Sequence, residues 1–351
     1  MGMYRTAIVG ARRGLHHARA YDGVENMQVV ALCEIDEERR NAGARELGVK
    51  GYADYEDMLA HERPDIVHAI TAPALPRALW VEPAAAAGVK ALVIEKPIAC
   101  RPAEAERLEQ AVQHTGLRVI VNHQMRYMPF AATLRAFHAA GTLGAIHFVR
   151  ATTQGGLLNM GTHLMDLALL AVDDVSPTAV WATVDGGAPY ASPDAPCPEN
   201  VLAAYTVPGG LRVLFEASPE ACGAADDPGV EAPPIPARCT LDLWGTNGRF
   251  WWRDFGSWGY QVEGMAQPFR SPTNFFADDL PAQRAFTQAI AEWLDDDRQP
   301  HQCRFERAKL GFDLIMAAYR SALHGQRVSF PPRLQDAEWA QVRERLTHER
   351  G

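Results

Sequence analysis

The chain has 351 residues, 47% of them hydrophobic, and a formal net charge of −9 at pH 7. This length favours two domains, and the apolar content is ample for conventional cores. The negative charge and the absence of any Lys/Arg block argue against nonspecific binding to nucleic acid. The sequence shows neither a run of about 18 apolar residues nor a signal segment, so we expect a cytoplasmic protein that does not contact membranes.

The first predicted element is a short strand that starts at residue 4 and breaks into a glycine turn. Gly10 and Gly14 enclose three residues, which include Arg12 and Arg13, and a helical pattern follows. In dinucleotide-binding folds, glycines at such a turn let backbone amides approach a pyrophosphate. The turn is one residue shorter than the usual G-x-G-x-x-G pattern, so its indication is weak on its own. These two glycines and two arginines are candidate cofactor contacts.

A second apolar run, residues 27–33, ends at an acidic residue, Glu34. Dinucleotide-binding folds place an acid about 20 residues beyond the glycines, where it binds the ribose hydroxyls of adenosine. A carboxylate there repels the 2′-phosphate of NADP, so Glu34 favours NAD. NADP remains possible if an arginine turns toward that phosphate. The candidates for such an arginine are Arg12, Arg13, Arg39 and Arg40.

Two further strands, residues 65–70 and 90–95, alternate with helical segments. This rhythm predicts a parallel, doubly wound sheet that binds ligands at the carboxyl ends of its strands. A lysine at such an end can hydrogen-bond both a cofactor ribose and a substrate hydroxyl, although a surface lysine in a turn gives the same pattern. The candidate ligand contacts at these strand ends are Thr71, Pro73, Glu95, Lys96 and Pro97.

The first domain is predicted to end after a strand at residues 117–121, so we place it at residues 1–122. The second domain, residues 123–334, shows strand patterns typical of an antiparallel sheet. Its strands are predicted at 144–153, 178–184, 201–206, 212–217, 239–245 and 250–252, its loops at 186–200 and 219–236, and its late helices at 280–294 and 305–323. Residues 335–351 are predicted to form a charged helix or tail.

Two sets of side chains in the sequence are expected to be structural. Most tryptophans of the second domain should lie on a buried sheet face or subunit interface rather than form a wall for stacking a sugar. They are Trp244, Trp251, Trp252 and Trp258. The six cysteines have no C-x-x-C spacing, which argues against a zinc ribbon or a disulfide framework, so we expect reduced thiols.

A stretch of the second domain, residues 159–166, carries a candidate catalytic histidine. If it is helical, about 3.6 residues per turn bring Asn159, His163 and Asp166 onto one stripe. Oxidising a secondary alcohol requires removal of its hydroxyl proton, which an imidazole can accept near neutral pH. His163 is therefore the candidate base, while Asp166 is either a core residue or a partner of the imidazole. No metal site is expected, because too few ligands cluster there.

The order of these features resembles the family of glucose-fructose oxidoreductase, myo-inositol dehydrogenase and the MocA rhizopine-catabolism protein (Gfo/Idh/MocA). The resemblance covers nearly the whole chain and depends on several motifs in order. They are the glycine turn followed by His17, the acidic Glu34, and residues 71–73, 95–97, 121–127, 141–144, 159–166, 317–322 and 325–331.

The resemblance implies an N-terminal Rossmann domain that binds NAD(P) and a C-terminal α/β domain with an open, mainly antiparallel sheet. That sheet lines the substrate cleft and commonly makes the oligomer interface, so we expect a homodimer or homotetramer. The catalytic Lys and His of the family correspond to Lys96 and His163, and the Asp four residues before the His corresponds to Asn159. An Asn can orient a hydroxyl or an imidazole, but it cannot carry a proton or a negative charge.

The resemblance also places residues 122–127 near the nicotinamide and the substrate. Asn122 is then a candidate cofactor contact, and Arg126 and Tyr127 are candidate substrate contacts or structural residues. The expected substrate contacts are Lys96, Arg126, Tyr127, Asn159 and His163, of which Lys96, Asn159 and His163 are the catalytic candidates.

The implied function is NAD(P)-dependent hydride transfer to or from a secondary alcohol or ketone of a sugar, cyclitol or related polyhydroxy compound. The Asn at position 159 keeps a second hypothesis open, in which transient oxidation serves a redox-neutral elimination, epimerisation or glycoside cleavage. A third hypothesis is a noncatalytic regulator that senses a sugar or a dinucleotide. The presence of both Lys96 and His163 argues against this third hypothesis.

Overall fold

The computed structural model describes residues 2–186, 188–190, 195–219, 221 and 238–348. The chain forms two compact units. Unit 1 contains Met1–Ala99, Ala103–Tyr127 and Asp279–Ala308, and unit 2 contains Cys100–Pro102, Met128–Asp278 and Lys309–Gly351. None of the described helices is long and apolar enough to cross a membrane.

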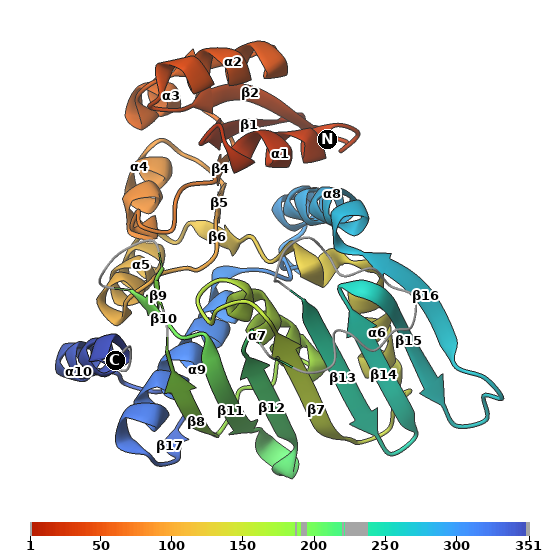
Figure 1. Cartoon of the computed structure of the whole chain (residues 1–351). Helices are drawn as coiled ribbons and strands as arrows, with labels where there is room; N and C mark the ends of the chain where they lie inside the picture. Colours follow the sequence, from red (N-terminus) through yellow and green to blue (C-terminus); the bar gives the residue numbers. More distant parts are fainter. Residues whose placement is uncertain (1, 187, 191–194, 220, 222–237, 349–351) are drawn as a thin grey trace. The chain divides into compact units, whose positions relative to one another are not determined.

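Unit 1 is built on a six-stranded parallel sheet with the order β3-β2-β1-β4-β5-β6 (Figure 1). The strands are β1 (Tyr4–Val9), β2 (Met27–Cys33), β3 (Lys50–Tyr52), β4 (Ile66–Ala69), β5 (Ala91–Ile94) and β6 (Arg118–Val121). The helices of this part are α1 (Arg13–Ala18), α2 (Glu37–Leu47), α3 (Tyr55–Glu62), α4 (Val81–Ala86) and α5 (Pro102–Thr115). The strand order reverses beside β1, which confirms the predicted doubly wound sheet and puts its ligand-binding edge at the carboxyl ends of the strands.

One segment of unit 1 comes from late in the sequence, where we predicted only the second domain. Helix α8 (Phe275–Asp295) places Phe286 and Ile290 in the same core cluster as Ile8 and Ile120 of the parallel sheet. The chain after it also joins the sheet, because the Val121 amide donates to the Cys303 carbonyl at 2.8 Å.

The predicted boundary at residue 122 is therefore corrected, since residues 123–127 and 279–308 pack with the first unit. The amphipathic period of residues 280–294 indicates that this helix buries one face, but it does not indicate against which sheet.

Unit 2 is built on a nine-stranded sheet with the order β16-β15-β14-β13-β7-β12-β11-β8-β17, in which only the β12–β7 pair is parallel. The strands are β7 (Ile146–Thr153), β8 (Ala179–Asp185), β11 (Asn200–Thr206), β12 (Arg212–Ala217), β13 (Cys239–Gly245), β14 (Gly248–Arg253), β15 (Phe255–Val262), β16 (Phe269–Asn274) and β17 (Val328–Ser329). A mainly antiparallel sheet was predicted, and this sheet confirms it.

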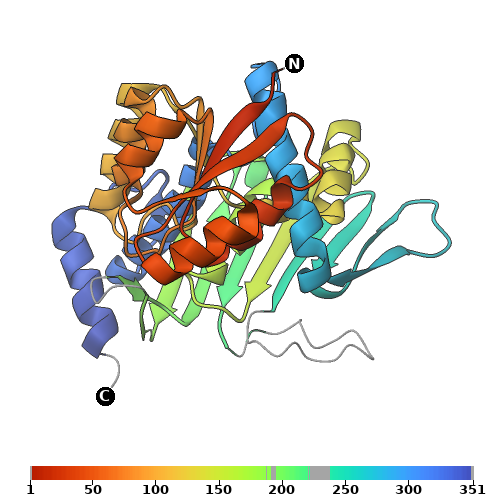
Figure 2. The ribbon, with the colours of Figure 1, turned by 90° about the horizontal axis from the view of Figure 1, so that it is seen from above.

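Three helices lie against one face of the nine-stranded sheet, as both views show (Figures 1 and 2). They are α6 (Pro129–Ala140), α7 (Met160–Ala171) and α9 (Phe305–His324). Phe130 of α6 stacks on Trp252, with ring centroids 4.6 Å apart, so this tryptophan belongs to the core as expected. The predicted charged C-terminal segment forms α10 (Asp336–His348).

The predicted loop at 186–200 contains the two-residue strands β9 (Ala188–Pro189) and β10 (Pro196–Cys197), which pair with each other. Most of the predicted loop at 219–236 lies outside the described residues. The cysteines in the described ranges are buried.

Candidate active site

The glycine turn follows β1 at the carboxyl edge of the parallel sheet. Gly10 has φ +95°, and a Cβ added there would lie 2.2 Å from the Ile70 carbonyl oxygen. No other residue type fits without moving this backbone. At Gly14 an added Cβ would lie 3.1 Å from the Ile8 side chain, so the first turn of α1 packs tightly on β1. The shortened turn therefore keeps the steric requirement of a dinucleotide-binding turn.

Glu34 lies beside this turn, at the end of β2. Its carboxylate accepts hydrogen bonds from the backbone amides of Ala11 at 2.8 Å and Asp36 at 3.1 Å, and from the Arg39 guanidinium at 3.4 Å. Burial raises the pKa of Glu34, but these donors outweigh burial, so its pKa lies below the usual range. The group is therefore a carboxylate at neutral pH, and a carboxylate has further lone pairs for ribose hydroxyls.

The arginines that were candidates for binding a 2′-phosphate differ in the contacts that they make. Arg39 pairs with Glu34 and with Asp36, and Arg40 donates to the backbone carbonyl of Glu34 at 3.0 Å. Arg12 is exposed in the glycine turn. Arg39 and Arg40 are thus engaged with the end of β2, an arrangement that favours NAD over NADP.

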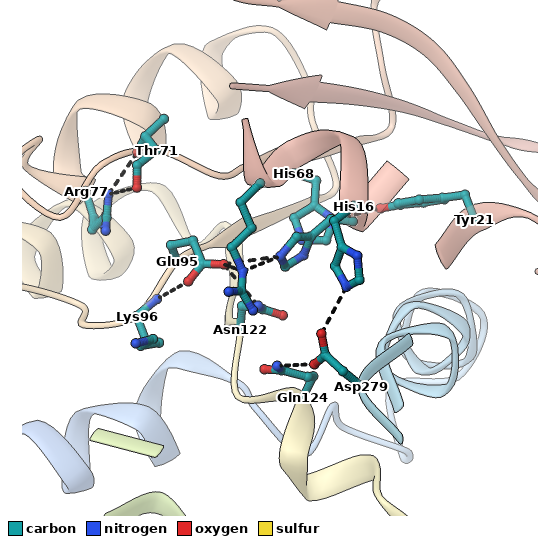
Figure 3. Close-up of polar contacts among 12 residues, drawn as sticks. His16, Tyr21, His68, Thr71, Arg77, Glu95, Lys96, Asn122, Gln124 and Asp279 are labelled. Carbon is teal, nitrogen blue, oxygen red and sulfur yellow. Dashed lines mark hydrogen bonds and ion pairs between the residues drawn. The ribbon is translucent and has the colours of Figure 1, made fainter. Parts of the chain in front are cut away.

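Glu95 is the centre of the polar contacts at the ends of β5 and β6 (Figure 3). Its Oε2 accepts from the Lys96 amide at 3.1 Å, and its Oε1 accepts from the Asn122 side chain at 3.1 Å. His17 Nε2 lies 3.4 Å and Arg13 Nε 3.9 Å from the same Oε1. This buried carboxylate therefore links the glycine helix α1 to the backbone that carries Lys96.

His17 and His68 are fully buried beneath the glycine turn. Their rings meet edge to face at 5.1 Å, and the Tyr21 hydroxyl lies 3.1 Å from His68 Nδ1. Burial lowers the pKa of both histidines well below the usual range, and the charge of Arg13 lowers that of His17 further. His17 is therefore neutral near pH 7, and its Nε2 accepts a hydrogen bond from Arg13 Nε at 3.3 Å, so its approach to Glu95 is not an ion pair.

The glycine-turn motif of the sequence includes His17, and the structure packs its buried ring against His68 and near Glu95. His68 was not singled out, because its place in an apolar strand pattern is that of an ordinary core position.

Residues 122–127 all lie in unit 1, and most are buried. Tyr127 packs its ring edge to face against Phe286 at 5.7 Å, and its hydroxyl accepts from the Gln302 amide at 3.2 Å. These contacts support the structural alternative for Tyr127. Arg126 is completely buried in the short helix η3 (Gln124–Tyr127).

The candidate base lies in unit 2. Helix α7 begins at Met160, directly after an exposed Asn159 with φ −97° and ψ −95°. His163 and Asp166 are both buried in the helix. The predicted stripe therefore holds for His163 and Asp166 but not for Asn159, whose backbone is not helical.

The segment before α7 is held by a strand that the sequence motifs did not indicate. The Leu158 amide donates to the Cys197 thiol of β10 at 3.2 Å, and the Leu157 amide donates to the Pro198 carbonyl at 3.1 Å. Residues 157–159 are therefore positioned by chain about 40 residues away, which no local pattern reveals. No group of three or more metal-binding side chains occurs among the described residues.

Comparison with known proteins finds a family match for the N-terminal part of the chain. Residues 4–123 match the model of the GFO_IDH_MocA family, described as an oxidoreductase family with an NAD-binding Rossmann fold. This match covers less than half of the chain. The matched part contains the glycine turn, Glu34 and the Glu95–Lys96–Pro97 motif.

A curated protein similar to this chain is D-apiose dehydrogenase from Paraburkholderia graminis, which is 28% identical over 198 residues. That alignment covers 50% of this chain and 52% of the relative, so it spans about half the length of the curated protein.

Two solved structures share the fold over almost the whole chain. An Agrobacterium radiobacter oxidoreductase in complex with NAD+, L-tartaric acid and magnesium has a TM-score of 0.77 and 19% identity, covering 93% of this chain and 98% of that one. The WlbA dehydrogenase from Bordetella pertussis, in complex with NADH and UDP-GlcNAcA, has a TM-score of 0.72 and 19% identity, covering 94% of this chain and 100% of that one. At these identities the likeness concerns the fold.

Proposed function

We propose that the protein is an NAD-dependent dehydrogenase that transfers hydride between nicotinamide and a secondary alcohol or ketone of a sugar, cyclitol or related polyhydroxy compound. The observation that carries this proposal is the carboxylate of Glu95, which fixes the backbone of Lys96 at the carboxyl edge of the parallel sheet. The residues present fit a dinucleotide, because Gly10 leaves no room for a Cβ and Glu34 is a charged carboxylate at the ribose position.

Within this proposal, bound NAD supplies the hydride acceptor or donor, and the protein manages the hydroxyl proton. Lys96 donates a charge-assisted hydrogen bond to the substrate oxygen as negative charge develops there. His163 accepts the hydroxyl proton, and Asn159 orients the hydroxyl or the imidazole through its amide. Arg126 remains a candidate substrate contact, and Gly10, Arg12, Arg13, Gly14, Thr71, Pro73, Pro97 and Asn122 complete the proposed cofactor contacts.

The amide at position 159 favours a second candidate function. Without an acid there, proton transfer through His163 has less support, and a redox-neutral reaction that returns the hydride to the substrate needs no net exchange of cofactor. Retention of NAD through purification, with product formed but no NADH accumulating, would distinguish this lyase, epimerase or glycosidase activity from a dehydrogenase.

Self-association through the unit 2 sheet is part of the same proposal. The face opposite α6, α7 and α9 carries Trp181 and Leu202, which are 41% and 40% exposed on neighbouring strands. Large apolar side chains exposed together on one sheet face are typical of an interaction surface. We therefore propose a homodimer or homotetramer, which light scattering after size exclusion would establish.

The first test is a tryptophan-fluorescence titration of the protein with NADH and NADPH, followed by turnover assays on a panel of polyols. We expect tighter binding of NADH and turnover of at least one polyol. Binding without turnover on any polyol would count against the dehydrogenase, and failure to bind either dinucleotide would refute a cofactor role for the glycine turn and Glu34.

A further inference from the structure

Arg77 is a buried cation that joins two turns at the ligand-binding edge of unit 1. It opens the short helix η2 (Arg77–Trp80) and is only 2% exposed. Its Nη1 donates to the Thr71 hydroxyl at 2.8 Å and to the Ala72 carbonyl at 2.9 Å, both in the turn after β4. Its Nε lies 3.4 Å from the Pro97 carbonyl, in the turn after β5. Figure 3 shows Arg77 beside Thr71, with Glu95 and Lys96 on the neighbouring turn.

Arginine has a chemical reason to occupy this position. A buried guanidinium keeps its charge, so it is stable only where several acceptors surround it. Here backbone carbonyls and one hydroxyl act as acceptors, and the planar fork reaches two turns at once. A lysine has one nitrogen on a flexible stem and cannot hold both turns in a fixed relation.

The contact with Thr71 also fixes what that residue offers to a ligand. Because the Thr71 oxygen accepts from Arg77, its own O–H hydrogen is left to donate. The turn that carries Thr71 and the turn that carries Lys96 follow β4 and β5, on the opposite side of β1 from Glu34. If the adenosine ribose binds at Glu34, the nicotinamide half of the dinucleotide faces these two turns.

We infer that Arg77 is a positioning residue that holds the Thr71 and Lys96 turns in register, so that both side chains meet the nicotinamide half of the bound dinucleotide. This inference deepens the proposed function and rests on it. Because Arg77 is only 2% exposed, its proposed role does not require contact with substrate or cofactor. Arg77 acts through the two turns. Its loss should therefore lower NADH affinity and turnover but leave the pH dependence of kcat unchanged.

The test compares Arg77→Met, Arg77→Lys and the wild type. A displacement of about 1 Å at a reacting group costs up to about 10²-fold in rate, so we expect kcat/KM of Arg77→Met to fall about 10- to 100-fold. We also expect NADH affinity to fall about tenfold, and the pH dependence of kcat to be unchanged. Arg77→Lys should recover little, because it restores the charge but not the fork.

The matched control is Arg253→Met in unit 2. Arg253 also donates to backbone carbonyls, those of Leu241 and Trp252, and it pairs with Asp242 at 2.8 Å. The Arg253→Met variant should have a lower melting temperature but an NADH affinity within about twofold of the wild type.

Unchanged NADH affinity in Arg77→Met, with only a loss of melting temperature like that of Arg253→Met, would overturn the positioning role. So would full recovery in Arg77→Lys. Failure of the wild type to bind NADH would instead refute the proposed function, which separates the two failures. If the wild type binds NADH without turnover, the affinity comparison alone decides the role of Arg77.

Discussion

The two halves of the proposed catalytic machinery are supported in different ways. In unit 1, the backbone of Lys96 is held by buried polar side chains, chiefly Glu95 and Asn122. In unit 2, the segment before α7 is held by its own backbone, since the Gly161 amide donates to the Gly156 carbonyl at 3.1 Å, and by the thiol of Cys197. Buried polar networks fix geometry at the cost of desolvation, whereas backbone contacts fix a turn almost independently of side-chain identity. The geometry of the unit 1 half, which we call the cofactor side, should therefore be more sensitive to single polar substitutions than that of the unit 2 half.

The largest expected effect is the loss of the amine itself. Lys96→Ala should lower kcat by about 10² or more, because the developing alkoxide loses its charged hydrogen-bond donor. His163→Ala should give a loss of similar size if it is the base. The control is Lys90→Ala, which removes an exposed lysine, paired with Asp65 at 2.8 Å, just before the same strand β5. Steady-state kinetics with saturating NAD would measure all three, and near-normal turnover of Lys96→Ala would refute the assignment of this residue.

The two units should also differ in how pH affects their stability. In unit 1, burial lowers the pKa of His301 to about 4 and those of His17 and His68 well below the usual range. The unfolded chain binds protons on these groups below about pH 6.5, where the folded chain does not, so stability falls as the pH drops. The His301 shift alone corresponds to roughly 3 kcal/mol between pH 6.5 and pH 4.

His301 gives this acid sensitivity a geometric basis. Its Nδ1 accepts from the Cys303 amide at 3.0 Å, so its Nε2 carries the proton and donates to the Phe286 carbonyl at 3.0 Å. Protonation of Nδ1 would place its N–H against the Cys303 N–H, so the hydrogen bond between them would be lost. His301→Gln should therefore flatten the loss of melting temperature between pH 7 and pH 4.5, and a slope equal to that of the wild type would show that this histidine does not contribute.

Unit 2 contains a buried group whose contribution to stability changes with pH in the opposite direction. Burial raises the pKa of Asp254 to about 7. The folded chain then binds a proton between about pH 3.9 and pH 7 that the unfolded chain releases, so the stability from this group is lost as the pH rises.

Asp254→Asn should raise the melting temperature at pH 8, by an amount equivalent to as much as about 4 kcal/mol, and should have much less effect at pH 4. Asp242→Asn is a suitable control, because that partly exposed carboxylate is paired with Arg253. Calorimetry at the two pH values measures the difference, and an equal change at both would contradict the buried, protonated state.

The same contrast explains what the sequence could predict. Most candidates of the cofactor side are adjacent to strand ends, so the alternation of strands and helices was enough to bring Gly10, Glu34 and Lys96 to one edge of the sheet. The pattern could not show that α8 completes this unit, because an amphipathic period indicates a buried face but no partner. Arg77 was missed because a lone arginine in a turn has no signature until its carbonyl acceptors are brought together by the fold.

The smallest expected effect concerns Asn159, which stands where the resembled family has an Asp. Asn159 precedes α7 and is exposed, so a carboxylate there would be solvated and the helix would keep its start. A negative charge near an imidazole raises its pKa, although solvent weakens this at an exposed site. In the pH profile of kcat, Asn159→Asp should therefore shift the acidic limb to higher pH, by less than about one pH unit. Because backbone contacts hold the turn, the melting temperature should hardly change. An unmoved profile would mean that His163 does not respond to charge at position 159, so the base would then have to be sought elsewhere.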